Sequence, residues 1–525
     1  MQKRIRIVSL SILFVILLIG IIVINNNSNN KYSFTQDGIK YALTLDGNKI
    51  TSFPSKGMYR AQVTCDGADG SWLYDDWKLA IENITGAISC DIDFSTINKT
   101  NLNDYIISLT DTTQGTGKVV NENMQVDNST FTAGAKLEQS DYSVSSNDAT
   151  YPFEWDDTNK TWTSTNHTHS ATATFIFNVA TAGNYQVCYK QSSERTCDYT
   201  IFYKDNSPIK SLQGISNSDF ECYYLGTLTT SNTIKVTYQK DGSTSSGSDN
   251  VIFYLQSGKY NENIQNVTDT RYEGKNPNNY IWFNNEYWRI IGVFDSASHG
   301  VSGKKLVKII RNDVLGALVW HVMGINDWTT SSLNSILNGA YYNATDGTSS
   351  GYCYINTDWE AISANCDYTK KGIQSGYRGM IANVTWHLGG YSNDETTAEA
   401  FYGYERGTTV YSGRPTSTTG YIGLVYPSDY GYSVLSSSCA RTTNLSSYDN
   451  ATCAGQSWLY GKGWEWTLTP HSSHSDDVFR LLYNGTLSNG VAYSGYGFRP
   501  VLYLDSSVFL YDGDGSLENP YIIGM

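Results

Sequence analysis

Apolar residues recur at every second position over much of the chain between residues 59 and 255. Ala171, Ala173, Phe175 and Phe177 form the clearest set. Because successive side chains of a strand point to opposite faces, each such set predicts a strand with one buried face. Many short strands separated by turn signals are typical of a β-sandwich, which we predict over residues 151–257.

The same alternation predicts a small β domain over residues 32–111. Its sets are Tyr59, Ala61, Val63 and Cys65; Trp77, Leu79 and Ile81; and Ile88, Cys90, Ile92 and Phe94. Cys65 and Cys90 both fall on core faces, which predicts a disulfide that stabilises a domain with few apolar residues. Residues 112–150 are rich in Thr, Gly, Asn and Ser with little periodicity, and we predict a linker there.

From residue 266 to residue 525 the pattern predicts an α+β domain. Helical periodicity predicts one helix after Asn326-Asp327-Trp328, a second over residues 371–388 and a third over residues 398–406. Asn484-Gly485 and Asn489-Gly490 predict hairpins, since both residues tolerate the positive φ of a type I′ turn. Helices that precede a closing antiparallel meander indicate an α+β domain. The chain as a whole is predicted to be mainly β.

The N-terminus predicts a location outside the cell. Basic residues within the first six positions precede an apolar run from residue 7 to residue 24. We predict a cytoplasmic tail (1–6), a transmembrane signal anchor (7–24) and an extracellular remainder in a single-pass membrane protein. A cleaved signal peptide is the alternative, but Asn25-Asn26-Asn27 follows the run where a small-x-small cleavage site would stand.

The nine cysteines agree with an oxidising environment. No CxxC occurs, so zinc and thioredoxin-type chemistry lack their usual signature. Spacing predicts the pairs Cys65–Cys90, Cys188–Cys197, Cys353–Cys366 and Cys439–Cys453, which leaves Cys222 unpaired.

Composition narrows the class of partner. Aromatic residues make up 14% of the chain and charged residues 16%, which is enough apolar material to bury cores, so global disorder is not expected. The net charge of −14 argues against a nucleic-acid partner, because phosphate binding needs a basic face.

Two segments have the residue types of metal sites. His471 and His474 stand beside Asp476 and Asp477, but they lie in a loop rather than on a helix face, and we predict a solvated loop. The pair His167 and His169 receives the same interpretation. The run Asp512-Gly513-Asp514-Gly515-Ser516 begins like a calcium loop and lacks the glutamate at loop position 12, so a glycine turn is predicted. No metal and no cofactor is expected.

Several motifs together resemble a family of uncharacterised single-pass surface proteins of gut Gram-positive bacteria. They are Asn326-Asp327-Trp328, Trp386-His387-Leu388-Gly389-Gly390, Gly413-Arg414-Pro415-Thr416, Trp464-Glu465-Trp466-Thr467-Leu468-Thr469 and Gly497-Phe498-Arg499-Pro500-Val501-Leu502. The C-terminal domain is similar to C-type-lectin-like and formylglycine-generating-enzyme folds. The sandwich resembles jelly-roll carbohydrate-binding modules, inserted between the segments at Gly115 and Arg271. This resemblance implies a fold and a cell-surface address.

The lectin-like resemblance implies a ligand surface in the loop-rich segment 407–462. Its candidate ligand-binding residues are Tyr411, Arg414, Tyr421, Tyr426, Tyr430 and Tyr432, with Trp464 and Tyr496 beyond the segment. Tyr, Gly and Ser give adaptable recognition at low entropic cost. The alternative is that the tyrosines cover the core, that Arg414 holds a loop, and that one of Trp464 and Trp466 is buried.

The sequence thus predicts a membrane-anchored adhesion or ligand-binding protein whose ligand is a glycan or a surface protein. It is not expected to be an enzyme: no cysteine follows Cys453 to supply the late pair of the formylglycine-generating enzymes. The calcium-lectin motifs Glu-Pro-Asn and Gln-Pro-Asp are also missing. The alternatives are a hydrolase that uses the His471 loop and an envelope structural protein without a small ligand.

The anchor hypothesis predicts that the protein is not released by signal peptidase. N-terminal sequencing of protein recovered from cell membranes should find chains that retain residues 7–24. A mature population that begins mostly after Ile24 would contradict it.

Overall fold

The computed structural model describes the chain from residue 34 with short gaps. The described ranges are 34–36, 38–55, 59–73, 76–96, 100–137, 142–164, 169–192, 198–213, 220–240, 249–347, 353–357, 360–393, 395–449, 451–461 and 463–525. The predicted tail and anchor, residues 1–24, lie outside them. None of the helices in the described ranges has the length and apolar character that crossing a bilayer requires. The chain divides into two compact units, Met1–Met124 with Val267–Met525, and Gln125–Asn266.

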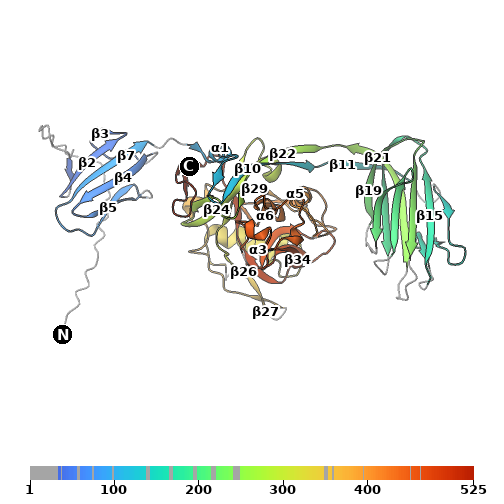
Figure 1. The fold of residues 1–525 in the computed structure, drawn as a ribbon. Helices are drawn as coiled ribbons and strands as arrows, with labels where there is room; N and C mark the ends of the chain where they lie inside the picture. The colour runs from blue at the N-terminus through green and yellow to red at the C-terminus, as the bar shows by residue number, and fades with distance from the viewer. Residues whose placement is uncertain are drawn as a thin grey trace. The chain divides into compact units, whose positions relative to one another are not determined.

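Residues 34–96 form a small β domain, drawn in blue in Figure 1. Its main sheet has the order β1-β2-β7-β4, with β3 on β2, beside a β5–β6 hairpin. The strands are β1 (Phe34–Gln36), β2 (Ile39–Leu45), β3 (Asn48–Ile50), β4 (Tyr59–Asp66), β5 (Asp69–Leu73), β6 (Lys78–Glu82) and β7 (Ser89–Thr96). Cys65 and Cys90 stand opposite each other on β4 and β7 and form the predicted disulfide.

Unit Gln125–Asn266 is a sandwich of two antiparallel sheets, the green strands of Figure 1. One sheet contains β11 (Thr130–Leu137), β13 (Glu154–Asp156), β14 (Thr161–Ser164), β16 (Gly183–Ser192), β19 (Glu221–Leu228) and β21 (Asp249–Asn261). The other contains β12 (Tyr142–Ser146), β15 (Ala171–Asn178), β17 (Tyr199–Lys204), β18 (Ser207–Gln213) and β20 (Thr233–Lys240). Phe175 and Phe253, one from each sheet, pack with ring centroids 5.0 Å apart in the shared core. The sandwich predicted over 151–257 is present.

The linker predicted over residues 112–150 is wrong. β9 (Thr113–Gln114), β10 (Gly117–Asp127), β11 and β12 lie within it. Thr and Asn are placed there on strands whose exposed positions are polar, so the apolar alternation is too weak to recognise. β11 and β12 bring the start of the sandwich forward to Gln125.

The C-terminal domain begins earlier than residue 266, with a segment that follows the small β domain. β8 (Thr100–Asn101) pairs with β37 (Phe509–Asp512), and α1 (Leu102–Ser108) follows with Asn101 as its N-cap. The boundary predicted at residue 111 is therefore too late. Two strand residues and a two-turn helix are too short to give a periodic signal.

A large mixed sheet forms the body of this domain. Its strands run in the order β31-β36-β25-β24-β23-β38-β37-β8, while β10 pairs with β9 and β22, and β22 with β24. The remaining bounds are β22 (Ile264–Gly274), β23 (Tyr280–Phe283), β24 (Glu286–Phe294), β25 (Leu306–Arg311), β31 (Ile422–Gly423), β36 (Val501–Tyr503) and β38 (Tyr521–Gly524).

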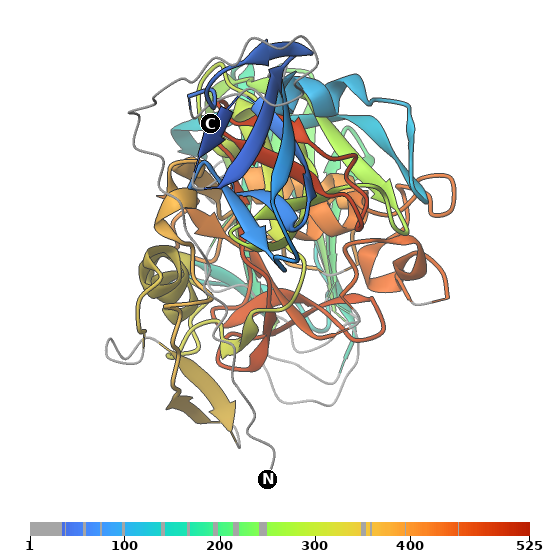
Figure 2. The same cartoon turned by 90° about the vertical axis from the view of Figure 1, so that its left-hand side faces the viewer.

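The closing strands join a second sheet of order β26-β35-β32-β33-β34, in red at the lower side of the domain in Figure 2. Its strands are β26 (Gly316–Val319), β32 (Glu465–Pro470), β33 (Asp477–Leu481), β34 (Leu487–Val491) and β35 (Gly495–Phe498). Two hairpins complete the β structure: β27 (Tyr354–Thr357) with β28 (Glu360–Ser363), and β29 (Val384–His387) with β30 (Ser417–Gly420). The hairpin predicted at Asn484-Gly485 is present, because β33 and β34 pair antiparallel on either side of it. The rest of the predicted antiparallel meander is wrong: Asn489-Gly490 lies within β34, and β35 pairs with β32 in parallel.

The helices agree with two of the three predictions. The first comprises η2 (Trp328–Thr330), α3 (Ser332–Ile336) and a π-helical turn η3 (Leu337–Tyr341); the third is α5 (Ala398–Arg406). The helix predicted over 371–388 is wrong, because only α4 (Ser375–Arg378) forms before strand β29. Three glycines in the run weaken a helix, and Val384 and Trp386 alternate as strand residues. α2 (Ser296–His299), α6 (Pro427–Tyr432), η5 (Leu445–Ser447) and η6 (Ala454–Gln456) complete the helical turns.

A cluster of buried charges lies between α5, α6 and the large sheet. We call it the buried charge cluster; its members are Asp269, Arg271, Lys308, Glu405, Arg406 and Asp429. The carboxylate of Asp429 accepts hydrogen bonds from Arg271 at 3.0 Å and from Lys308 at 2.5 Å. Burial alone would raise the pKa of Asp429, but Lys308 and Arg271 outweigh it and hold that pKa below its ordinary value.

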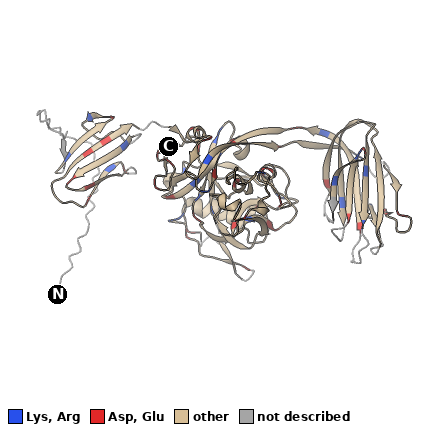
Figure 3. Cartoon of the chain, in the orientation of Figure 1, with Lys and Arg blue, Asp and Glu red and all other residues tan. Residues whose placement is uncertain are grey.

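Elsewhere charged side chains are scattered along the strands rather than gathered in one segment (Figure 3). The prediction that nucleic acid is not a partner stays a prediction.

The β10–β22 ribbon predicts that the sandwich can be removed cleanly. Thr268 donates to Asn123 at 2.8 Å and Gln125 donates to Asn266 at 3.1 Å, so Met124 and Val267 are cross-strand neighbours. Replacing Gln125–Asn266 by Asn-Gly closes the ribbon with a two-residue turn. We expect the shortened protein to keep a cooperative thermal transition by near-UV circular dichroism; loss of that transition contradicts the insertion.

Asp429→Asn tests the buried charge cluster. Because the change removes the carboxylate that pairs with buried Lys308 and leaves Arg271 with Asp269 alone, we expect the free energy of unfolding to fall by about 3–5 kcal/mol in urea denaturation. The exposed Asp313 supplies the matched control, and Asp313→Asn should change stability by less than about 0.5 kcal/mol. Equal effects of the two changes would show that the cluster is not a structural centre.

Candidate functional site

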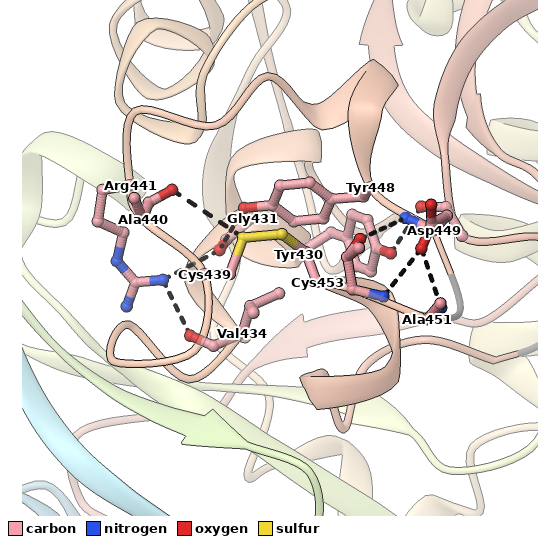
Figure 4. Close-up of a disulfide and its surroundings, with 12 residues drawn as sticks. Tyr430, Gly431, Val434, Cys439, Ala440, Arg441, Tyr448, Asp449, Ala451 and Cys453 are labelled. Atoms are coloured by element: carbon pink, nitrogen blue, oxygen red, sulfur yellow. Dashed lines mark hydrogen bonds between the residues drawn. A yellow bond between two sulfur atoms is a disulfide. The ribbon is translucent and has the colours of Figure 1, made fainter.

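Three of the tyrosines predicted to bind ligand are buried. Tyr426, Tyr430 and Tyr432 have exposed fractions of 1%, 0% and 3% on or beside α6. Tyr430 donates to the Gly485 carbonyl at 2.7 Å and lies beside the predicted Cys439–Cys453 disulfide (Figure 4). Side chains enclosed in this way cannot contact a ligand on the surface, so the prediction is corrected: these tyrosines form core.

The other three residues of segment 407–462 are half-buried and hold loops together. Arg414 donates from Nε to Asn326 Oδ1 at 3.1 Å and from Nη2 to the Ser475 carbonyl at 3.2 Å. Its guanidinium carbon lies 5.5 Å from the Tyr411 ring centroid. Tyr421 stacks on Tyr342 with centroids 4.3 Å apart. The alternative interpretation of Arg414, a residue that holds a loop, agrees with these contacts.

The histidine loop is held together by the side chain of Asn326. Asn326 Nδ2 donates to the carbonyls of His471, His474 and Asp477 at 2.8, 2.7 and 3.1 Å. His474 Nδ1 lies 2.8 Å from Asp477 Oδ2. Among the described residues, no three His, Cys, Asp or Glu side chains are grouped for a metal ion.

The other two metal-like segments are partly described. His169 stacks on Tyr151, and His167 lies outside the described residues. Gly513 and Gly515 have φ of 92° and 78°, as the predicted glycine turn requires.

Trp464 and Tyr496 are both near the surface and belong to one cluster. Their ring centroids lie 5.2 Å apart, and Trp464 also stacks on Tyr483 at 6.2 Å. Trp464 is 40% exposed and Tyr483 61% exposed. Trp466 is fully buried and donates to the Leu318 carbonyl, which confirms that one of the two tryptophans belongs to the core.

A second group of aromatic side chains lies on the outer face of the sandwich. Val187, Phe253 and Leu255 point into the core, so their strand neighbours point away from it. On this side stand Phe131, Phe220, Tyr224, Tyr254 and Tyr260, which we call the aromatic face.

The rings of the aromatic face contact one another. Tyr224 and Tyr260 stack with centroids 3.9 Å apart at an interplanar angle of 11°. Phe131 packs beside Tyr224 at 6.0 Å, across Gly258, where any Cβ would collide with its ring. Phe220 packs on Tyr254 at 5.0 Å. The result is two packed groups of rings, set along β21 on one face of the sheet.

Polar side chains lie among these rings. Lys136 Nζ stands 4.0 Å from the Tyr254 centroid. Gln186 donates to Gln256 at 3.0 Å, and Tyr224 donates to Asn184 at 3.1 Å. Burial raises the pKa of the Tyr254 phenol, which therefore stays neutral and able to donate. The face combines apolar ring surface with donors and acceptors.

A disulfide fixes the strands beneath the rings. Cys188 on β16 stands opposite Cys222 on β19, with Cα atoms 4.0 Å apart, and the two are bonded. Cys188 also pairs across the sheet with Tyr254. The predicted Cys188–Cys197 disulfide and the predicted unpaired Cys222 are therefore wrong. The prediction used closeness in sequence, whereas Cys188 is bonded to a cysteine on the adjacent strand of the sheet. Cys197 lies outside the described residues. Cys353–Cys366 is present as predicted.

The fold does not require aromatic residues on an outer face. On the opposite sheet the outward positions of β15 and β20 carry no aromatic residue: they include Ile176 and the polar residues Thr172, Thr174, Lys235, Thr237 and Gln239. The alternation of apolar residues indicates the inward face of each strand and gives no sign of the aromatic face. Tyr254 and Tyr260 on the outward phase of β21 were the available signal.

No protein-family model matches the chain, and no curated protein does. Solved structures with a likeness include a low-affinity xylan-binding module, CBM86, from Roseburia intestinalis (11% identity, 27% of this chain, 96% of that chain, TM-score 0.17). A family 35 carbohydrate-binding module from Clostridium thermocellum has 11% identity over 26% and 97% of the chains and a TM-score of 0.14. The secreted protease VesC from Vibrio cholerae has 9% identity over 35% and 32%, with a TM-score of 0.16. At these TM-scores the likenesses carry no argument, and the proposals below rest on side-chain geometry.

Proposed function

We propose that the protein is a membrane-anchored extracellular protein that binds a glycan on the aromatic face of its inserted sandwich. The observation that carries this proposal is the two packed groups of rings held over a disulfide-linked sheet. The anchor rests on the apolar run of residues 7–24.

The chemistry of the face suits sugars. A pyranose ring has an apolar face of C–H groups and an edge of hydroxyl groups. Aromatic rings can cover the C–H face at low entropic cost. The side-chain amides of Gln186, Gln256 and Asn184 can form hydrogen bonds with the sugar hydroxyl groups. Binding sites that are mostly apolar with a few placed polar groups give both affinity and orientation.

The disulfide and the sheet make the face rigid before ligand arrives. Rings already stacked on one another lose little rotamer freedom when a sugar covers them. Extended strands also place the two groups of rings along β21, with Tyr254 and Tyr260 six residues apart, or about 20 Å of strand at roughly 3.3 Å per residue. A face of that length matches an oligosaccharide better than a monosaccharide.

Tyr254→Ala tests the proposal. A glycan array of residues 34–525 selects an oligosaccharide, and isothermal titration calorimetry then measures its affinity. Removing the Tyr254 ring should weaken binding about tenfold, which corresponds to about 1.4 kcal/mol, as expected when an aromatic anchor of a binding site is truncated.

The opposite sheet supplies a matched control. Tyr203 is half-buried, with Lys235 Nζ 4.1 Å from its ring centroid, and so reproduces the Tyr–Lys pair of the aromatic face. Tyr203→Ala should leave affinity unchanged. The proposal is wrong if the array finds no glycan, or if both variants bind like the parent.

A further inference from the structure

Arg480 has no hydrogen-bond acceptor among the residues that the structure describes. Its Nε and Nη1 atoms are covered yet unpaired. Leaving a covered donor without a partner costs about 1–3 kcal/mol, and more for a charged group. The side chain as a whole is half-buried, so part of it is open to a ligand.

Other arginines of the same domain show that acceptors are the rule. Arg311 is paired with Glu286, Arg441 with Glu122 and Glu273, and Arg499 with Glu465. Arg480 differs from them in what surrounds it. A Cβ at Gly490 would lie 2.7 Å from its Nε and Cζ atoms, so the guanidinium rests directly on backbone.

Aromatic rings enclose the other side of Arg480. Its guanidinium carbon lies 4.5 Å from the Trp464 centroid and 4.4 Å from the Tyr496 centroid. Tyr483 extends this stack beyond Trp464. We call Trp464, Arg480, Tyr483 and Tyr496 the arginine platform. Three neighbouring strands, β32, β33 and β35, hold or flank its members, which fixes their geometry.

The electrostatics of the platform favour an incoming anion. Burial lowers the pKa of Arg480, and Asp477 opposes that shift only in part. Asp477 lies on the same strand, but its carboxylate is hydrogen-bonded to His474. A carboxylate from a ligand would accept hydrogen bonds from the unpaired N–H groups of Arg480 and offset the desolvation of its charge.

We propose that the arginine platform is a second binding site, which takes a carboxylate-bearing saccharide such as a uronic acid. The carboxylate of such a sugar is attached directly to the pyranose ring. One residue can therefore place its anion on Arg480 and its C–H face on Trp464 or Tyr483, both of which are exposed. This site is independent of the aromatic face, and either can fail without the other.

The test uses a glucuronate-terminated oligosaccharide and its carboxyl-reduced, glucose-terminated counterpart. Residues 34–525 should bind the acid at least about tenfold more tightly, since one charge-assisted hydrogen bond is worth about 1.5–3 kcal/mol. Arg480→Gln should abolish that preference. Trp464→Ala should weaken binding of both sugars.

Arg378→Gln is the control, because Arg378 lies 5.9 Å from the Tyr342 centroid but already donates to the carbonyls of Ile373 and Asn343. It should keep the preference. If Arg480→Gln lowers the melting temperature, Arg480→Met replaces it, because Met keeps an unbranched side chain on the rings without the positive charge. The proposal is overturned if the parent shows no preference, if the Arg480 variant that folds keeps it, or if an acidic peptide of equal charge binds as tightly.

Discussion

The carboxylate of Asp429 is the contact on which the C-terminal domain depends. It joins Arg271 from β22, Lys308 from β25 and its own helix α6, all fully enclosed. Removing three charges from water costs free energy. Only ion pairs and hydrogen bonds of good geometry between the charged groups offset that cost, so the positions of the three side chains are closely restricted. This requirement fixes α6 against the sheet and places Tyr426 and Tyr430 in the interior.

The same constraint explains why a large insertion is tolerated. Asp269 and Arg271 on β22 lie in the cluster, and the boundary between the two units falls at Asn266–Val267 on the same strand, which pairs with β10. The ribbon is anchored at its base by buried ion pairs, so what is attached at its far end does not disturb the core. Each unit keeps its own core and can present its own surface.

We propose that recognition uses sheet faces and not the long loops that the sequence suggested. Segment 407–462 is rich in Tyr, Gly and Ser, as adaptable loops are, yet Tyr430 and Tyr432 pack inward and Arg414 bonds to Asn326. The exposed rings are on strands or at strand ends, at Tyr254 in the sandwich and at Trp464 beside β32. Strands hold rings more firmly than loops do, which lowers the entropy lost on binding.

Strand periodicity made much of the fold predictable. The sandwich, the hairpin at Asn484-Gly485, α5 and three of the disulfides follow from alternation, turn residues and cysteine spacing. The pairing of Cys188 with Cys222 did not, since it depends on which strands become neighbours in space. The burial of Tyr430 and the lack of a described hydrogen-bond acceptor for Arg480 also depend on tertiary contacts, which local sequence patterns do not predict. Trp464 is among the residues predicted to bind ligand, whereas its neighbour Arg480 is not.

The central claim is that the aromatic face of the sandwich is a glycan-binding surface. A crystal structure of the protein with an array-selected oligosaccharide bound tests it most directly. We expect pyranose rings within van der Waals contact, about 4 Å, of Tyr254 or Tyr224, with sugar hydroxyls on Gln186 or Gln256. Sugar bound elsewhere, with the aromatic face left bare at saturating ligand, would contradict the claim.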